Sequence, residues 1–158
     1  MGIYDLNATG AKRIVLPPTP GSWDGKSTAA TIVWKEDGRY LMLYQGWSEG
    51  SGPRILGLAE SEDGMHWKKY EKNPVMSPSG VWDQMGFECG SLLRINDKYW
   101  LYYTGIGADG KARIGLATSE DLMSWSQYEH NPIMDLGQPG SFDSRGVAFP
   151  SVLRGTQN

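Results

Sequence analysis

The sequence has almost no cysteine, no long apolar run and no excess of positive charge. One cysteine, Cys89, among 158 residues excludes an internal disulfide and every zinc site built only from cysteines. No segment approaches the roughly 18 apolar residues that a membrane-spanning helix needs. A formal net charge of -3 offers no basic field to a phosphate backbone, so we expect neither nucleic acid nor a membrane as a partner.

The first residues, 1–13, lack the apolar stretch of a signal peptide. We therefore expect a cytoplasmic protein, or a secreted one if a leader was removed. No group of metal-ligating residues stands out, and we expect no metal and no cofactor. A 3.6-residue apolar period is also missing, so the sequence predicts almost no helix.

Glycine and large aromatic residues are abundant, with 21 Gly, 7 Trp and 8 Tyr, which favours short strands joined by turns. An internal repeat confirms a modular chain. The segment Gly57–Trp67 (GLAESEDGMHW) recurs 58 residues later as Gly115–Trp125 (GLATSEDLMSW). The dipeptide Asn73-Pro74 recurs at the same offset as Asn131-Pro132.

Each repeat is expected to form four strands. In the second repeat we expect them near 91–95, 99–104, 113–118 and 125–128, with Asn96-Asp97 as a turn pair. Tandem four-stranded units of this length are typical of propeller blades. The predicted fold is all-β, a β-propeller of four-stranded antiparallel blades that is incomplete in one chain.

The predicted division of the chain gives about two and a quarter blades. Residues 1–17 form the end of a preceding blade, 18–76 and 77–134 form two blades, and 135–158 begin another. Because open blade edges invite pairing, the chain is either a fragment of a longer protein or completes the propeller as a homo-oligomer.

The blade ending carries a family resemblance. Gly115–Trp125 followed by Asn131-Pro132 resembles the S-x-D-L-x-x-W…N-P ending of glycoside hydrolase families 43 and 32, five-bladed propellers of the arabinanase, levansucrase and invertase superfamily. The dipeptide Glu88-Cys89 is similar to the motif that carries the acid in family 32. The Asn-Asp-Pro and Arg-Asp-Pro motifs of the invertase-like enzymes are absent, so their full catalytic set is not transferred. The resemblance implies a carbohydrate partner.

Carboxylates near the start of each repeat are the candidate catalytic groups. Asp24, Asp83 and Asp143 recur in three units, where each either lines the central funnel or caps its own loop. Glu88 is found in one unit only, opposite Ala29 and Ala148. Because glycoside hydrolysis uses two carboxylates, Glu88 is the candidate acid and Asp24 or Asp143 the base or nucleophile; the alternative for Glu88 is an ion pair with an arginine.

Four further residues are candidates for substrate binding. Arg145 suits sugar hydroxyls, a carboxylate or a phosphate, or else pairs with Glu88 or Asp143. Trp47 is a candidate platform for a sugar ring at the rim; Gln45, near the end of the same predicted strand, and Asp83, one of the aspartates at the funnel, are the other candidates. By contrast, Cys89 is expected to pack in the blade.

The Ser-x-Asp pairs of the blade ending are expected to satisfy the amides of a turn. They are Ser61 with Asp63 and Ser119 with Asp121.

Three functions follow from these residues. The first is a glycoside hydrolase that uses paired carboxylates. The second is a non-catalytic carbohydrate-binding or scaffold module, and the third is a sugar phosphorylase in which Arg145 helps to hold phosphate.

Overall fold

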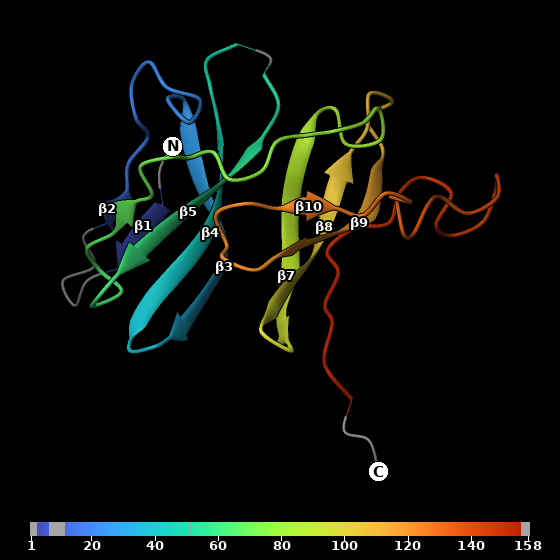
Figure 1. Cartoon of the computed structure of the whole chain (residues 1–158). Helices are drawn as coiled ribbons and strands as arrows, with labels where there is room; N and C mark the ends of the chain where they lie inside the picture. The colour runs from blue at the N-terminus through green and yellow to red at the C-terminus, as the bar shows by residue number, and fades with distance from the viewer. Residues whose placement is uncertain (1–2, 7–11, 51, 156–158) are drawn as a thin grey trace. The chain divides into compact units, whose positions relative to one another are not determined.

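The computed structural model describes residues 3–6, 12–50 and 52–155, and the chain divides into two compact units, Met1–Ser77 and Pro78–Asn158. Every regular element of the described residues is a strand, as the sequence predicted (Figure 1). The finer division into blades at 17, 76 and 134 stays a prediction. No helix of the described residues has the length and apolar character needed to cross a membrane.

The first unit contains two antiparallel sheets. A two-stranded sheet pairs β1 (Ile3–Leu6) with β2 (Lys12–Leu16). A four-stranded sheet follows in the order β3 (Ser27–Glu36), β4 (Arg39–Trp47), β5 (Ile55–Ser61) and β6 (Lys68–Lys69).

The second unit repeats the four-stranded sheet. Its strands are β7 (Gly86–Ile95), β8 (Lys98–Ile106), β9 (Ala112–Ser119) and β10 (Ser126–Gln127), again paired in chain order. The inner strand β7 begins five residues earlier than the sequence predicted. Asn96 and Asp97 form the predicted turn, and both have the positive φ angles (49° and 60°) that a tight hairpin requires.

After β10 the second unit continues as a segment without regular strands that lies against its own sheet. The amide of Val147 donates to the carbonyl of Ala112 at 3.0 Å. Further along, Phe149 donates to Thr104 Oγ1 at 2.9 Å and Val152 to Ser91 Oγ at 3.1 Å. This segment therefore passes from the start of β9 toward the middle of β7.

An aromatic residue packs on glycines in each unit. In the first, the Trp23 ring covers Gly46 and Gly57 and lies 5.6 Å from the Tyr44 ring, beside a buried cluster that includes Leu16 and Met42. Trp82 does the same in the second unit, on Gly105 and Gly115, 5.6 Å from the Tyr103 ring. The glycines are required because any Cβ would occupy the ring volume.

The Asn-Pro dipeptide closes each blade onto its third strand. Asn73 Oδ1 accepts from the Leu58 amide at 2.8 Å, and Asn73 Nδ2 donates to the Leu58 carbonyl and to the Tyr44 hydroxyl. Asn131 repeats all three bonds with Leu116 and Tyr103. One side chain thus imitates a strand partner, which explains why the dipeptide recurs.

The Ser-x-Asp pairs hold the turn before the last strand. Ser61 Oγ accepts from the amide of Gly64, and Asp63 Oδ1 accepts from the amides of Met65 and His66. Ser119 and Asp121 make the equivalent bonds in the second unit. These contacts agree with the turn role predicted for them.

Candidate functional site

The candidate residues lie at one end of each four-stranded sheet, which we call the leading end because the first strand begins there. The leading end of the first unit holds Asp24, Gln45 and Trp47, since Ser27 pairs with Trp47. Glu88 lies at the leading end of the second unit, where Gly86 pairs with Ile106. The aspartates lie in the loops before β3 and β7, residues 17–26 and 77–85, and in the corresponding segment of the third repeat, residues 135–146; we call all three lead-in loops.

Asp24 is buried in the first unit and bound by a lysine. Its side chain is 1% exposed, and its Oδ2 lies 2.5 Å from Lys69 Nζ and 3.3 Å from the Tyr44 hydroxyl. Lys69 Nζ also donates to the Pro17 carbonyl and to Thr19 Oγ1, so all three of its protons have acceptors. Among the described residues, Asp24 Oδ1 has no hydrogen-bond partner.

Asp83 is buried in the second unit and bound by its own lead-in loop. Its Oδ1 accepts from the amides of Gly80 at 2.8 Å and Ser79 at 3.2 Å. Burial raises the pKa of the Asp83 carboxyl, and these amide bonds act in the opposite direction. Burial, and after it the charge of Asp83, raises the pKa of the Tyr103 hydroxyl.

Asp83 accepts from two amides of its own loop, as in the loop-capping alternative, whereas the hydrogen bonds of Asp24 come from Lys69 and Tyr44, outside its loop. In each unit the carboxylate interacts with the equivalent tyrosine, Tyr44 through a hydrogen bond and Tyr103 through its charge. Sequence reasoning missed Lys69, although its counterpart at the repeat offset, Gln127, signals that the two units differ here. The catalytic role of Asp24 and the substrate role of Asp83 stay predictions.

Glu88 is the third residue of β7 and is partly exposed. It pairs with Thr104, whereas Ala29 pairs with Gln45 in the first unit, so the register agrees with the predicted alignment of Glu88 and Ala29. The register shifts between Glu88 and Gly90, as it does between Ala30 and Ile32 in the first unit, which is the pattern of a β-bulge. Bulges redirect a side chain and are frequent beside active sites. The role of Glu88 as the acid stays a prediction; the side chain of Cys89 lies outside the described residues.

Asp143 and Arg145 lie in the third lead-in loop. Asp143 Oδ1 accepts from Ser141 Oγ at 2.5 Å, and the Asp143 carbonyl accepts from the Gly137 amide at 3.4 Å. Arg145 is exposed. Phe142, the counterpart of Trp23 and Trp82, is fully exposed.

Trp47 and Gln45 complete the candidate set in the first unit. The Arg54 guanidinium lies 5.7 Å from the centre of the Trp47 ring, within the range of a cation–π contact. Gln45 Oε1 is buried without a hydrogen-bond partner among the described residues. Substrate binding by either residue stays a prediction.

An arginine bound by two aspartates at the leading end of the second unit was not foreseen from the sequence. The Arg113 side chain is 14% exposed and contacts both Asp109 and Asp135. The hydrogen bond from Arg113 holds the pKa of the Asp109 carboxyl below its usual range. The pKa of Asp135 is also lowered, first by the Leu136 amide and then by Arg113.

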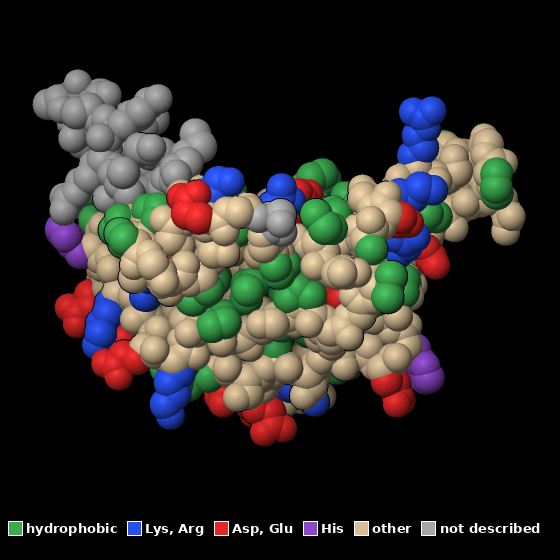
Figure 2. All heavy atoms as spheres, turned by 90° about the horizontal axis from the view of Figure 1, so that it is seen from above, with side chains coloured by type: hydrophobic (Ala, Val, Ile, Leu, Met, Phe, Trp, Pro, Cys, Tyr) green, Lys and Arg blue, Asp and Glu red, His purple; other side chains and the backbone are tan. Residues whose placement is uncertain are grey.

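The repeat offered a signal for this cluster. Arg113 and Asp135 stand opposite Ile55 and Ser77 of the first repeat, so they are specific to one unit, as Glu88 is. Figure 2 shows basic and acidic side chains next to one another on the side of the molecule where the third lead-in loop projects. Among the described residues, no group of three His, Cys, Asp or Glu side chains is arranged to hold a metal ion.

Comparison with known proteins identifies relatives that process sugars. The profile of glycoside hydrolase family 130, described as beta-1,4-mannooligosaccharide phosphorylase, matches residues 28–157. A 1,2-beta-oligomannan phosphorylase of Thermoanaerobacter sp. is 27% identical over 124 residues, which cover 73% of this chain and 42% of the relative. An uncharacterized protein of Mycobacterium tuberculosis is 32% identical over 126 residues, covering 77% of this chain and 40% of the relative.

A solved structure supports the fold. Fructan 1-exohydrolase IIa from Cichorium intybus superposes with a TM-score of 0.59 at 21% identity, covering 74% of this chain and 23% of the enzyme. The fold class and the propeller superfamily predicted from the sequence are therefore confirmed. The chain spans about two fifths of the length of the curated relatives it matches.

Proposed function

Because the chain belongs to glycoside hydrolase family 130, we propose that it contributes to phosphorolysis of β-linked manno-oligosaccharides. The observation that carries this proposal is the match of the family profile to residues 28–157, which include both four-stranded sheets. The phosphorylase, third among the functions considered from the sequence, thereby becomes the first.

Phosphorolysis needs a proton for the leaving sugar. An oxygen of inorganic phosphate bonds to the anomeric carbon as the glycosidic C–O bond breaks, and the departing oxygen takes up a proton. We assign the proton donor to Glu88, because it is specific to one unit, partly exposed and next to a β-bulge at the leading end. In this proposal Asp143, in the same unit, orients the sugar from its loop, and the role of Asp24 as base or nucleophile stays a prediction.

Phosphate also needs cations, and the second unit offers two at its leading end. The bond from the Val147 amide to the Ala112 carbonyl places the end of the third lead-in loop beside the start of β9. Arg145 and Lys111 each lie within two residues of this bond, and both are exposed. We propose that they bind the phosphate oxygens. Sugar binding by Trp47 and Gln45 of the first unit stays a separate prediction.

Hydrolysis is the second candidate. In that reaction water replaces phosphate as the nucleophile, and Glu88 can protonate the leaving sugar in the same way. The third is a carbohydrate-binding module without catalysis. For all three candidates we propose a carbohydrate partner and a homo-oligomer. We also propose that the protein is cytoplasmic, or secreted if a leader was removed.

The test is to incubate the protein with β-1,4-mannobiose and with β-1,2-mannobiose, in the presence and absence of inorganic phosphate. We expect mannose 1-phosphate only when phosphate is added. Glu88→Gln should lower the rate by about 100- to 10,000-fold, because the substituted amide has no acidic proton. Glu120→Gln, in an exposed turn of the same unit, is the matched control and should not change it.

Each alternative gives a different result. Free mannose released without phosphate would establish hydrolysis in place of phosphorolysis. Saturable binding of the disaccharides with no product would leave only the binding module. Full activity of Glu88→Gln would remove Glu88 as the proton donor.

A further inference from the structure

The Arg113 guanidinium joins three parts of the second unit. Arg113 is the second residue of β9, and the carboxylate of Asp109 receives two parallel bonds from it, Nη1 to Oδ1 at 3.1 Å and Nη2 to Oδ2 at 2.9 Å. Its Nε donates to Asp135 Oδ1 at 2.8 Å. Paired bonds of this kind fix both the distance and the plane of the guanidinium.

Both aspartates continue these contacts into the segments that carry the candidate phosphate ligands. Asp109 Oδ1 also accepts from the Lys111 amide at 3.0 Å, which orders the turn between β8 and β9. Asp135 Oδ1 also accepts from the Leu136 amide at 2.7 Å, at the start of the lead-in loop that ends in Arg145. Arg113 therefore links the turn of Lys111 to the loop of Arg145.

This link is not needed to build a blade. In the first unit, the strand after the turn pairs with the blade ending through Leu56 and Met76, and in the second unit Ile114 pairs with Met134 in the same way. The first unit achieves this with Ile55 in place of the arginine and Ser77 in place of Asp135. Sheet formation therefore does not require the cluster of Arg113, Asp109 and Asp135, and a function specific to the second unit explains it better.

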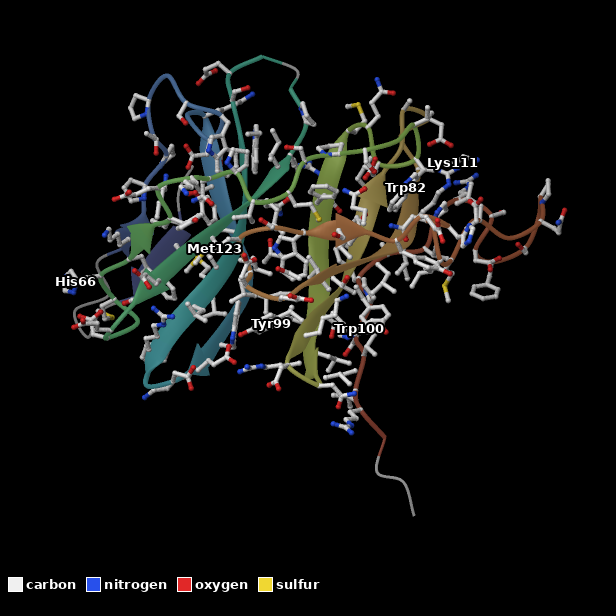
Figure 3. The ribbon with its side chains drawn as sticks, in the orientation of Figure 1. His66, Trp82, Tyr99, Trp100, Lys111 and Met123 are labelled. Carbon is white, nitrogen blue, oxygen red and sulfur yellow. The ribbon has the colours of Figure 1, made fainter. Side chains whose placement is uncertain are left out.

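Arg113 is poorly placed to bind phosphate itself. Its side chain is 14% exposed, and its donors already face two carboxylates and the Lys111 carbonyl. An incoming anion would have to displace Asp109 and Asp135. By contrast, Lys111 and Arg145 are exposed at the same end of the unit, where Figure 3 shows Lys111 near Trp82 and far from Tyr99 and Trp100.

We propose that Arg113, with Asp109 and Asp135, is a positioning residue that holds Lys111 and Arg145 in place to bind the phosphate group of the co-substrate. The inference rests on the proposed function, since it names the phosphate site of that reaction. Arg113 acts through the two cations and touches no reacting atom.

The experiment titrates inorganic phosphate into ¹⁵N-labelled protein and follows the amide signals of Lys111 and Arg145. Arg113→Met is compared with Arg94→Met, whose guanidinium pairs with Asp97 at 3.3 Å in the hairpin at the other end of the sheet. The set is completed by Arg145→Gln and by the double variant that combines Arg113→Met with Arg145→Gln. Hydrogen exchange of the Val147 amide, measured without phosphate, reports how well the loop is held.

We expect Arg113→Met to weaken phosphate binding by about tenfold and to speed exchange of the Val147 amide. Arg94→Met should alter neither. The losses should be less than additive, because in the Arg145→Gln background the part of the effect that acts through Arg145 is already lost and only the part that acts through Lys111 remains. If Arg113→Met does not fold, Asp135→Asn provides a second variant that weakens only the contact to the lead-in loop.

Additive losses in the double variant, or an unchanged phosphate affinity in Arg113→Met, would overturn the inference. Lack of any phosphate shift in the unaltered protein would remove the phosphate site and with it the proposed phosphorolysis. The Val147 exchange rate distinguishes the two failures, because it reports on the contact between Arg113 and the loop without any ligand.

Discussion

At the scale of single residues, the two units separate side chains that build a blade from those specific to one unit. Trp23 has a counterpart, Trp82, with similar contacts in the second unit, so the fold is sufficient to explain it. Glu88 and Arg113 have alanine and isoleucine as counterparts. A blade forms without either charge, and this difference makes both residues candidates for function.

Asp109 provides a prediction at this scale. The hydrogen bond from Arg113 lowers its pKa in the folded protein, so Asp109 contributes stability above the unfolded pKa of about 3.9, and this contribution is lost as the pH falls through the lower folded value. In Arg113→Met the pKa of Asp109 should rise toward about 3.9. A carbon-13 NMR titration of the carboxyl groups measures it.

Asp121 is the internal control for that titration. Its pKa is lowered first by the Ser124 amide and not by an arginine, so it should not move in Arg113→Met. An Asp109 pKa that is equally low in the variant would show that the guanidinium is not the cause. The free energy of unfolding should also fall less between pH 6 and pH 3 in Arg113→Met than in the unaltered protein.

At the scale of the elements, each sheet depends on glycines in its second and third strands. A Cβ built on Gly57 would lie 2.6 Å from Tyr44 Cζ and 2.8 Å from Trp23 Cη2, far inside van der Waals contact. The Tyr44 ring is fully buried, and the Trp23 ring packs against the same buried cluster. The recurrence of Gly57 as Gly115 therefore reflects how closely an aromatic ring approaches the backbone.

Gly57→Ala should lower the free energy of unfolding by about 1 to 3 kcal/mol, because the rings have to shift out of a packed position. Urea unfolding followed by tryptophan fluorescence measures this loss. Gly155→Ala is the control, since no atom lies within 4 Å of the position of its Cβ. Equal stability of the two variants would mean that the Trp23 ring does not pack as described.

At the scale of the whole molecule, large apolar side chains remain on the surface of the second unit. Phe142 is fully exposed, Leu153 is 88% exposed and Phe149 is 64% exposed. All three belong to the segment that follows the second blade ending. Apolar side chains gathered in one exposed segment are typical of surfaces that take part in protein–protein contacts.

We therefore expect a discrete homo-oligomer in solution, measured as mass by light scattering behind a sizing column. Phe142→Ser combined with Leu153→Ser should shift the mass toward the monomer, because the association buries these side chains. The combined variant Val33→Ser and Met123→Ser, at other exposed apolar positions, is the control. A monomeric unaltered protein at all concentrations would contradict the expectation.

Much of the fold was predictable because the chain contains its own repeat. The offset between Gly57–Trp67 and Gly115–Trp125 identified the unit, and Asn96-Asp97 marked a turn through residues that tolerate positive φ. The blade ending predicted the correct propeller superfamily. Within it, the resemblance pointed to families 43 and 32, whereas the profile match is to family 130. The Asn-Pro and Ser-x-Asp contacts explain this outcome, because the motif serves the scaffold that these families share.

The sequence by itself determined the repeat, the all-β architecture, most strand positions and the unusual identity of Glu88, since all of these depend on local preferences and on comparison of one unit with the other. Only the tertiary structure decided which carboxylates are held and by what. Lys69 reaches Asp24 across 45 residues, and Arg113 meets Asp135 across 22. Such contacts depend on the path of loops between strands, which no local pattern encodes.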